Sequence, residues 1–407
     1  MRRTSRAVIF ALGVLGPVAW GAEDPCRTQP DDAECARILS NLGAVYYSQA
    51  RYLEAEPLFQ RAINLWSFTA GNSADLAVTL HNQAAVYQAE GQYADAIQSY
   101  ERALALRESL LGQNSIGLLP LLNGLGESYF ELGEYTHSQQ MLDRAMSIIE
   151  LNRAGETPDG AATFATYGTL LKIRGQMPEA ERALKRALAV YRQTGETKEE
   201  SRVLNNLGRV MVAQGRRKEA ERLFREAIAR AEQLGPEQAD VAAGLSNFAN
   251  LLGAEHKYGE AERLLRRAEQ VDRRSLSADD PRLGYDTYNT GLLAFERKQY
   301  HAAEELFVRC LSTFEKNMPR NHPEIGKVTA SLAEVYRREN NLEQADILYR
   351  RALNILEQNW GAEDPQLLSL LESYSQLLRS RQEFAEAASI DMQAMKIRVT
   401  QALRSGS

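Results

Sequence analysis

Apolar residues recur along the chain at the three- and four-residue spacing of amphipathic helices. In one stretch, Leu204 and Leu207 fall on one face of a first predicted helix, and Leu223 and Phe224 fall on one face of a second. Gly215 lies between the two stretches, where a glycine is expected to end a helix. No run of useful length alternates as a strand would, so the sequence predicts an all-α fold.

This predicted helix pair is repeated along most of the chain. Each unit ends on a small residue, with a second small residue seven positions earlier and a large apolar residue three positions earlier; the ninth unit departs from this with Asp391. One helix pair cannot bury its apolar stripe alone, so neighbouring pairs must stack. The pattern therefore predicts nine stacked pairs over residues 36–394. The closing residues, spaced 40 to 42 positions apart, are Ala62, Ala103, Ala145, Ala187, Ala227, Ala268, Cys310, Ala352 and Ala394.

The order of Gly/Ala, Tyr, Ala, Phe and Ala positions resembles the tetratricopeptide repeat. Residues 322–353 carry the resemblance most fully, and they are similar to the 42-residue type of repeat found in kinesin light chains and in many bacterial proteins. The resemblance implies a right-handed α–α superhelix, in which the first helix of each pair lines the concave wall.

The N-terminus has the three-part plan of a secretory signal peptide. Arg2, Arg3 and Arg6 precede an uncharged, mostly apolar stretch over residues 7–20, and small residues follow. That stretch is shorter than the roughly 20 apolar residues that a spanning helix needs, so cleavage is favoured over an uncleaved anchor. We expect a protein of bacterial origin that is exported to the periplasm or the cell exterior. The predicted division is a signal peptide (1–22), an N-terminal cap (23–35), nine repeats (36–394) and a polar C-terminal cap or tail (395–407).

Two of the three cysteines lie close to the predicted cleavage site. Cys26 and Cys35 are nine positions apart and could pair in an exported protein. The alternative is two free thiols near the end of the chain. Cys310 replaces alanine at a closing position and is interpreted as a small core residue.

Composition and motifs argue against catalysis and against nucleic acid as a partner. The 407 residues carry a net charge of −6, whereas phosphate binding needs a basic face. Phosphate-loop, dinucleotide and zinc-protease motifs are lacking, and the five histidines show no spacing typical of metal ligands. We therefore expect no enzyme activity, no cofactor and no bound metal.

One polar position recurs on the predicted first helices, 21 residues before the closing residue. Five units carry asparagine there, and the other four carry Gly, Thr or Ser. In arrays like that of kinesin light chain, such asparagines bond the backbone of an extended peptide, and a carboxamide offers both donors and an acceptor for this. The alternative is that they bond the neighbouring helix and fix the repeat spacing. The predicted groove residues are Asn41, Asn82, Asn206, Asn247 and Asn289, with Arg209, Asn250 and Tyr288 as neighbours.

The sequence thus predicts a non-enzymatic scaffold that holds an extended or helical segment of a partner protein in its concave groove. The alternative is a structural component of a cell-envelope complex that acts through its convex face or its ends. The ends are predicted to be polar, which favours a monomer over open stacking.

Overall fold

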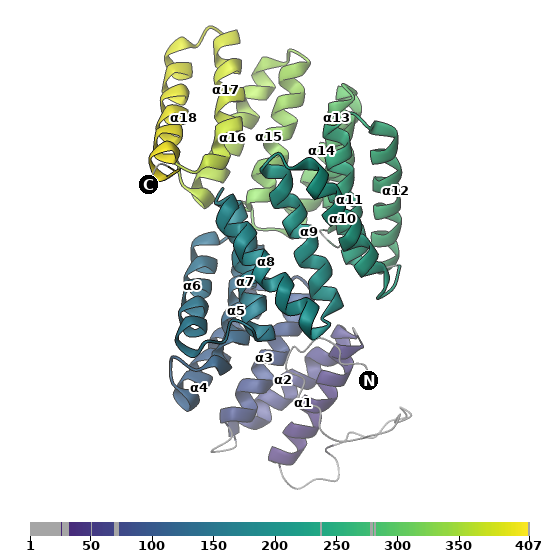
Figure 1. The fold of residues 1–407 in the computed structure, drawn as a ribbon, viewed down its shortest axis with the longest axis vertical. Coiled ribbons are helices and arrows are strands. Elements are labelled where there is room, and N and C mark those ends of the chain that lie inside the picture. The colour runs from purple at the N-terminus through teal and green to yellow at the C-terminus, as the bar shows by residue number, and fades with distance from the viewer. Residues whose placement is uncertain are drawn as a thin grey trace. The chain divides into compact units, whose positions relative to one another are not determined.

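The computed structural model describes residues 26, 32–49, 51–68, 73–236, 238–276, 280 and 282–405. The predicted signal peptide, residues 1–22, lies outside the described residues. Within them the chain forms α-helices and two short 3-10 helices, in an unbroken series of helix pairs (Figure 1). The pairs belong to two compact units, Met1–Thr166 and Tyr167–Ser407, and the boundary between the units falls inside one helix. No helix among the described residues is both long enough and apolar enough to cross a membrane.

The first unit holds three complete helix pairs and the start of a fourth. In each complete pair the two helices pack against each other. The elements are α1 (Asp32–Ser48), α2 (Tyr52–Phe68), α3 (Ser73–Ala89), α4 (Tyr93–Leu111), η1 (Ile116–Leu118), α5 (Leu119–Glu131), α6 (Tyr135–Asn152) and the first part of α7 (Pro158–Ile173).

The second unit holds the end of α7 and the remaining pairs. Here too each first helix packs on the second helix of its pair and on the second helix of the preceding pair. The elements are α8 (Met177–Thr194), α9 (Thr197–Ala213), α10 (Arg217–Glu232), α11 (Ala239–Ala254), α12 (Tyr258–Ser275), α13 (Arg282–Glu296), α14 (Tyr300–Asn317), α15 (Pro323–Arg338), α16 (Leu342–Trp360), η2 (Pro365–Leu367), α17 (Leu368–Ser380) and α18 (Phe384–Ser405).

The prediction of an all-α solenoid of nine helix pairs is confirmed. Every closing residue lies on the second helix of its pair and is at most 5% exposed. The small residue on the first helix is explained by the close approach of the two helices of a pair. A Cβ atom added to Gly208 on α9 would lie 2.6 Å from Cε1 of Phe224 on α10, so the large apolar residue of the second helix occupies the space that a side chain would need.

From the second pair onward, the turns within pairs use a left-handed backbone conformation. Gly215, between α9 and α10, has φ of 74°, which costs glycine little. The equivalent turn after α13 is made by Lys298 with φ of 60°, so the repeat geometry is kept there without a glycine. The turn is therefore set by the packing of the two helices as well as by residue type.

Two features at the ends differ from a simple division into cap and repeat. Cys26 and Cys35 are joined by a disulfide with 5.3 Å between their Cα atoms, and Cys35 already belongs to the first turn of α1. At the other end, α18 runs from Phe384 to Ser405, across the predicted start of the tail at residue 395. Met392 and Met395 on this helix are 68% and 64% exposed, so the final face is more apolar than the predicted polar cap.

Candidate functional site: the inner wall of the helix pairs

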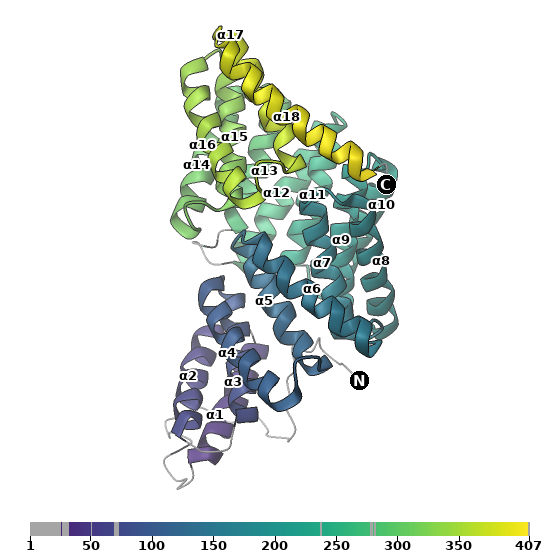
Figure 2. The same ribbon diagram turned by 90° about the vertical axis from the view of Figure 1, so that its left-hand side faces the viewer.

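Alternate helices also touch within each unit, and in both units they are the first helices of their pairs. In the first unit α1 contacts α3 and α3 contacts α5; in the second unit α9, α11, α13, α15 and α17 form a continuous series. Figure 2 shows α9 and α11 side by side in this series. In a curved stack of helix pairs, the side on which alternate helices meet is the inner side, and the resemblance predicts the groove on that side. We call the polar faces of α9, α11 and α13 the inner wall of the second unit.

Most of the predicted groove residues lie on this wall. Asn206 and Arg209 are on α9, Asn247 and Asn250 are on α11, and Asn289 and Tyr288 are on α13. The asparagines and Tyr288 are half-buried, whereas Arg209 is exposed. Asn41 on α1 is exposed and Asn82 on α3 is half-buried, and both belong to the first unit.

The asparagines of the inner wall hydrogen-bond between neighbouring repeats. Nδ2 of Asn206 donates to Oγ1 of Thr169 at 3.1 Å, and Nδ2 of Asn247 donates to Oδ1 of Asn205 at 3.1 Å. Each of these bonds joins one first helix to the preceding one. The packing role that the sequence left open therefore exists in the structure.

The wall continues in the same way at α13 and α15. Nδ2 of Asn250 donates to Oδ1 of Asn289 at 2.8 Å, and the hydroxyl groups of Tyr288 and Ser331 are 3.0 Å apart. A carboxamide has two N–H donors and an oxygen with two lone pairs, so one such bond uses only part of its capacity. The same side chains can fix the repeat spacing and still offer groups to a ligand.

The Tyr288 side chain is held in place by packing and by a hydrogen bond. Its ring packs on that of Phe307, with 5.6 Å between ring centroids. Burial, despite the hydrogen bond to Ser331, raises the pKa of the Tyr288 hydroxyl to about 12. Both the ring and the hydroxyl of Tyr288 are therefore already engaged within the protein.

A charged cluster faces the inner side of the second unit from α7, α9 and α15. Burial, reinforced by the positive charges of Arg209 and Lys327, lowers the pKa of Lys172 well below its usual range. Nζ of Lys327 bonds Oε1 of Glu324 at 2.6 Å and lies 5.7 Å from the ring centroid of Trp360. Burial acts to raise the pKa of Glu324, but Lys327 keeps it lowered.

Sequence reasoning did not find this cluster. Lys172 and Glu324 belong to repeats far apart in the chain. The position of Glu324, 28 residues before the closing residue, is acidic in several repeats, but the repeat spacing alone does not show that it lies near Lys172. Its charges are mixed, as they are further along α15, where Arg337 and Arg338 both bond Glu334. Charges of both signs therefore lie on these helices.

Two other kinds of candidate site are metal-ligand clusters and the free cysteine of the described residues. No group of three or more His, Cys, Asp or Glu side chains there could hold a metal ion. Cys310 is fully buried, and burial raises the pKa of its thiol to about 12, so it would not act as a nucleophile at neutral pH. What the inner wall offers is a set of hydrogen-bonding side chains at a regular spacing.

Comparison with known protein families finds the same family of repeats along the chain. A family model described as tetratricopeptide repeat matches residues 34–109, 75–150, 117–193, 160–233 and 240–316, and a second model of the same description matches residues 329–359. None of the curated proteins matches the chain.

Several solved structures are similar in fold. A Rap protein complexed with competence and sporulation factor is 15% identical, with 91% of this chain and 99% of that chain covered and a TM-score of 0.67. The Rap conjugation gene regulator of plasmid pLS20, in complex with the Phr* peptide, is 16% identical over 80% of this chain and 95% of that chain, with a TM-score of 0.58. Repeats of a putative kinesin light chain from Podosopora anserina are 20% identical over 51% of this chain and 98% of that chain, with a TM-score of 0.41.

Proposed function

Because the chain belongs to the tetratricopeptide repeat family, we propose that it is a non-enzymatic scaffold that binds an extended or helical segment of a partner protein along its inner wall. The observation that carries this proposal is the row of half-buried carboxamides on α9, α11 and α13, repeated at the spacing of the helix pairs. Carboxamides can bond the backbone of a segment whatever its side chains are. The folds of the two Rap proteins, each solved as a complex, agree with such a role.

We further propose that the protein works outside the cytoplasm. The basic and apolar N-terminus has the plan of a secretory signal. The bond between Cys26 and Cys35 fits an oxidising compartment, because such bridges persist mainly in exported proteins. The partner would then be another periplasmic or extracellular protein.

The central experiment compares two ways of breaking the same inter-repeat bond. Asn206→Ala removes the groove carboxamide, and Thr169→Val removes only its partner on α7. Residues 23–407 of the parent and of each variant would be immobilised and exposed to an envelope extract. Any partner captured would then be identified and titrated as a purified protein.

If the inner wall binds the partner, Asn206→Ala loses affinity and Thr169→Val keeps it. Loss of one or two hydrogen bonds to a bound backbone corresponds to about 1–3 kcal/mol, or roughly five- to more than a hundredfold in Kd. Equal weakening in both variants would show that only the packing bond matters. Unchanged affinity in both would move the binding site away from α9. Circular dichroism checks that both variants stay helical.

A second function is favoured by one observation, the exposed apolar face of α18. Phe384, Met392 and Met395 are 64%, 68% and 64% exposed on the last helix. Contacts of this end with another protein of an envelope complex would cover it. The molar mass in solution and partner capture by a Met392→Lys/Met395→Lys variant separate this function from binding at the inner wall, which the two substitutions leave intact.

A further inference from the structure

Two buried carboxyl groups meet where α11, α12 and α13 pack together in the second unit. Asp272 lies in the last turn of α12 and Asp286 lies in α13, and each residue is only 7% exposed. Their side chains are close enough to hydrogen-bond to each other if one of them carries a proton. A carboxyl pair at this depth is unusual, because buried acidic side chains are normally paired with cations.

The repeat pattern shows that both residues occupy core positions. The position of Asp272, four residues after the closing residue, carries Trp66 in the first repeat and Phe314 in the seventh. The position of Asp286, 24 residues before the closing residue, carries Thr79 in the second repeat. In the first unit, Nε1 of Trp66 donates to Oγ1 of Thr79 at 3.2 Å, so these two positions meet across a repeat junction there too. Only at the junction of repeats six and seven are both positions acidic.

Few groups around the pair could compensate for the negative charge of the two carboxylates. Ser246 on α11 lies beside Asp286 but makes no hydrogen bond of ordinary geometry. Oδ1 of Asp272 and Oδ2 of Asp286 are likewise without a hydrogen-bond partner among the described residues. Arg282 on α13 is near Asp272, but its guanidinium group bonds Asp280 at 2.7 Å.

The other charged groups that face the pair are mostly acidic. The negative charge of Asp280 acts on Asp272 and that of Glu269 acts on Asp286, whereas Arg282 contributes a positive charge near Asp272. Two ionised carboxylates in such a site would repel each other at close range in a medium of low dielectric constant. A single shared proton removes one charge and joins the two groups.

We propose that Asp272 and Asp286 share a proton, and that this proton makes the packing of α13 against α11 and α12 dependent on pH. Loss of the proton leaves two buried negative charges that push α12 and α13 apart. The inference concerns the repeat junction and does not need the proposed binding function. Where that function holds, Tyr288 and Asn289 follow Asp286 on the same helix, so the wall at α13 would respond to pH as well.

The direction of the pH effect follows from the pKa shifts. Burial, with the negative charges of Asp272 and Glu269, raises the pKa of Asp286 from 3.8 to about 7. Burial raises the pKa of Asp272 from 3.8 to about 6, against the effect of Arg282. The folded chain therefore binds more protons than the unfolded chain between about pH 4 and 7. Linkage then requires that this contribution to stability is present below about pH 4 and is lost as the pH rises through 7.

The test is the unfolding temperature of the full chain from pH 5 to pH 8.5, for the parent and for Asp286→Asn. The asparagine variant keeps a hydrogen bond to Asp272 without needing a proton. We expect its unfolding temperature, relative to that of the parent, to rise by several degrees between pH 5 and pH 8.5. The relative value is the one to use, because burial lowers the pKa of His81 to about 4 and that residue titrates in the opposite direction.

A matched control is Glu260→Gln on the exposed face of α12, which should follow the parent at every pH. If the difference in unfolding temperature between the parent and Asp286→Asn is the same at pH 5 and at pH 8.5, the proposal is wrong. An increase in the unfolding temperature of the parent with Mg²⁺ or Ca²⁺ at pH 8.5 that Asp286→Asn abolishes would also overturn it, in favour of a cation between the carboxylates. If Asp286→Asn does not fold, infrared spectra of the parent decide: a protonated carboxyl band at pH 6 that disappears by pH 9 supports the pair, and its absence at pH 6 contradicts it.

Discussion

At the scale of single residues, the smallest side chains set how closely the helices of a pair approach. Gly126, Gly208 and Gly291 each face a large apolar side chain of the second helix, at distances that leave no room for a Cβ atom. Elsewhere in the array alanine holds the same position, for example Ala84 and Ala333, both fully buried. The close approach is thus a property of particular pairs, and glycine is needed only where the facing ring or branch lies nearest.

Gly208→Ala should therefore destabilise the protein. The new Cβ would meet Phe224 at 2.6 Å, and Phe224 is 1% exposed and has no open space to move into. Overpacking of this kind costs about 1–3 kcal/mol. Chemical denaturation followed by circular dichroism measures the change.

Gly259→Ala is the matched control for this substitution. Gly259 lies in α12, and no atom comes within 4 Å of its added Cβ. Alanine favours the helix, so this variant should be as stable as the parent or up to about 1 kcal/mol more stable. A loss of stability in both variants alike would contradict the role given to the contact with Phe224.

The residue scale also shows what the sequence could and could not predict. The periodic positions placed Asn206, Asn247 and Asn289 on adjacent first helices, because a repeat fixes which face a position occupies. Their bonds to Thr169 and Asn205 could not be predicted, since these partners belong to other repeats and do not recur at one position. The acidic pair at Asp272 and Asp286 could not be predicted for another reason: acidic residues are abundant along the chain, and only packing shows which ones are buried.

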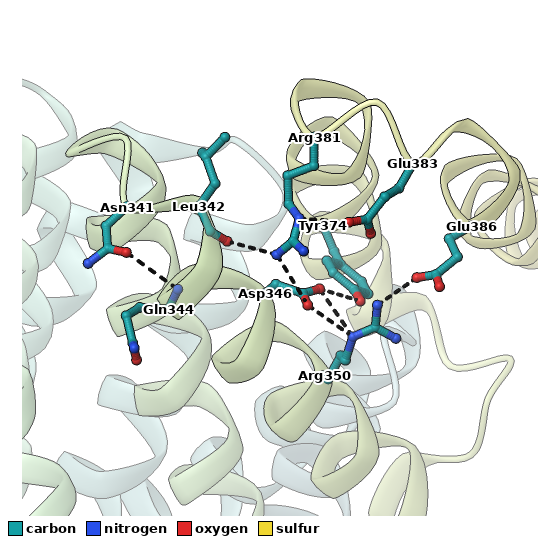
Figure 3. A network of polar contacts seen from close by, with 9 residues as sticks. All are labelled: Asn341, Leu342, Gln344, Asp346, Arg350, Tyr374, Arg381, Glu383 and Glu386. Carbon is teal, nitrogen blue, oxygen red and sulfur yellow. Dashed lines mark hydrogen bonds and ion pairs between the residues drawn. The ribbon is translucent and has the colours of Figure 1, made fainter.

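At the scale of helices, the last repeats are joined by a polar network around Asp346 (Figure 3). Its carboxylate on α16 accepts a hydrogen bond of 2.9 Å from the hydroxyl of Tyr374 on α17, and it pairs with Arg350 at 3.1 Å and with Arg381 at 3.4 Å. Arg350 reaches on to Glu386 of α18 at 2.6 Å. One half-buried carboxylate thereby connects three helices of two repeats.

Asp346→Ala is expected to loosen the ninth repeat before the rest of the unit. The substitution leaves the Tyr374 hydroxyl and Arg381 without their shared acceptor, at a cost of about 1–3 kcal/mol. Hydrogen exchange should become faster in α17 and α18 and stay unchanged in α9 to α12. Glu343→Ala, on the exposed side of the same helix, should leave exchange unaltered in both regions.

The ninth repeat also shows why a break in a pattern needs structure to interpret it. Asp391 stands where other repeats carry a large apolar residue, and this replacement is consistent with the prediction of a polar C-terminal end. The structure gives this carboxylate specific partners: it accepts a hydrogen bond from Ser375 at 2.7 Å and pairs with Arg379. Because the same helix exposes Met392 and Met395, a polar substitution inside the pair does not make the outer face polar.

At the scale of the whole molecule, the oxidation state of the cysteines connects the fold with the cellular compartment of the protein. The structure joins Cys26 to Cys35 and leaves Cys310 as the free cysteine, buried in α14. Export would allow the bridge to form, and the cytoplasm would keep it reduced.

Protein recovered from the periplasm or the medium should accordingly show one titratable thiol after denaturation without reductant, and three after reduction. Peptide mass mapping should assign the bridge to Cys26 and Cys35. A Cys310→Ala variant is the control and should show none before reduction. Three thiols in the unreduced exported protein would contradict the bridge.

The bonds that the inner-wall asparagines already make have a thermodynamic consequence for recognition. A partner backbone that takes the Asn250 amide at the expense of Asn289 exchanges one amide–amide hydrogen bond for another of the same kind. The net heat of such exchanges is small, so affinity must come mainly from apolar surface that the segment buries beside them. Titration calorimetry of a bound segment should then show a modest enthalpy and a clearly negative heat-capacity change.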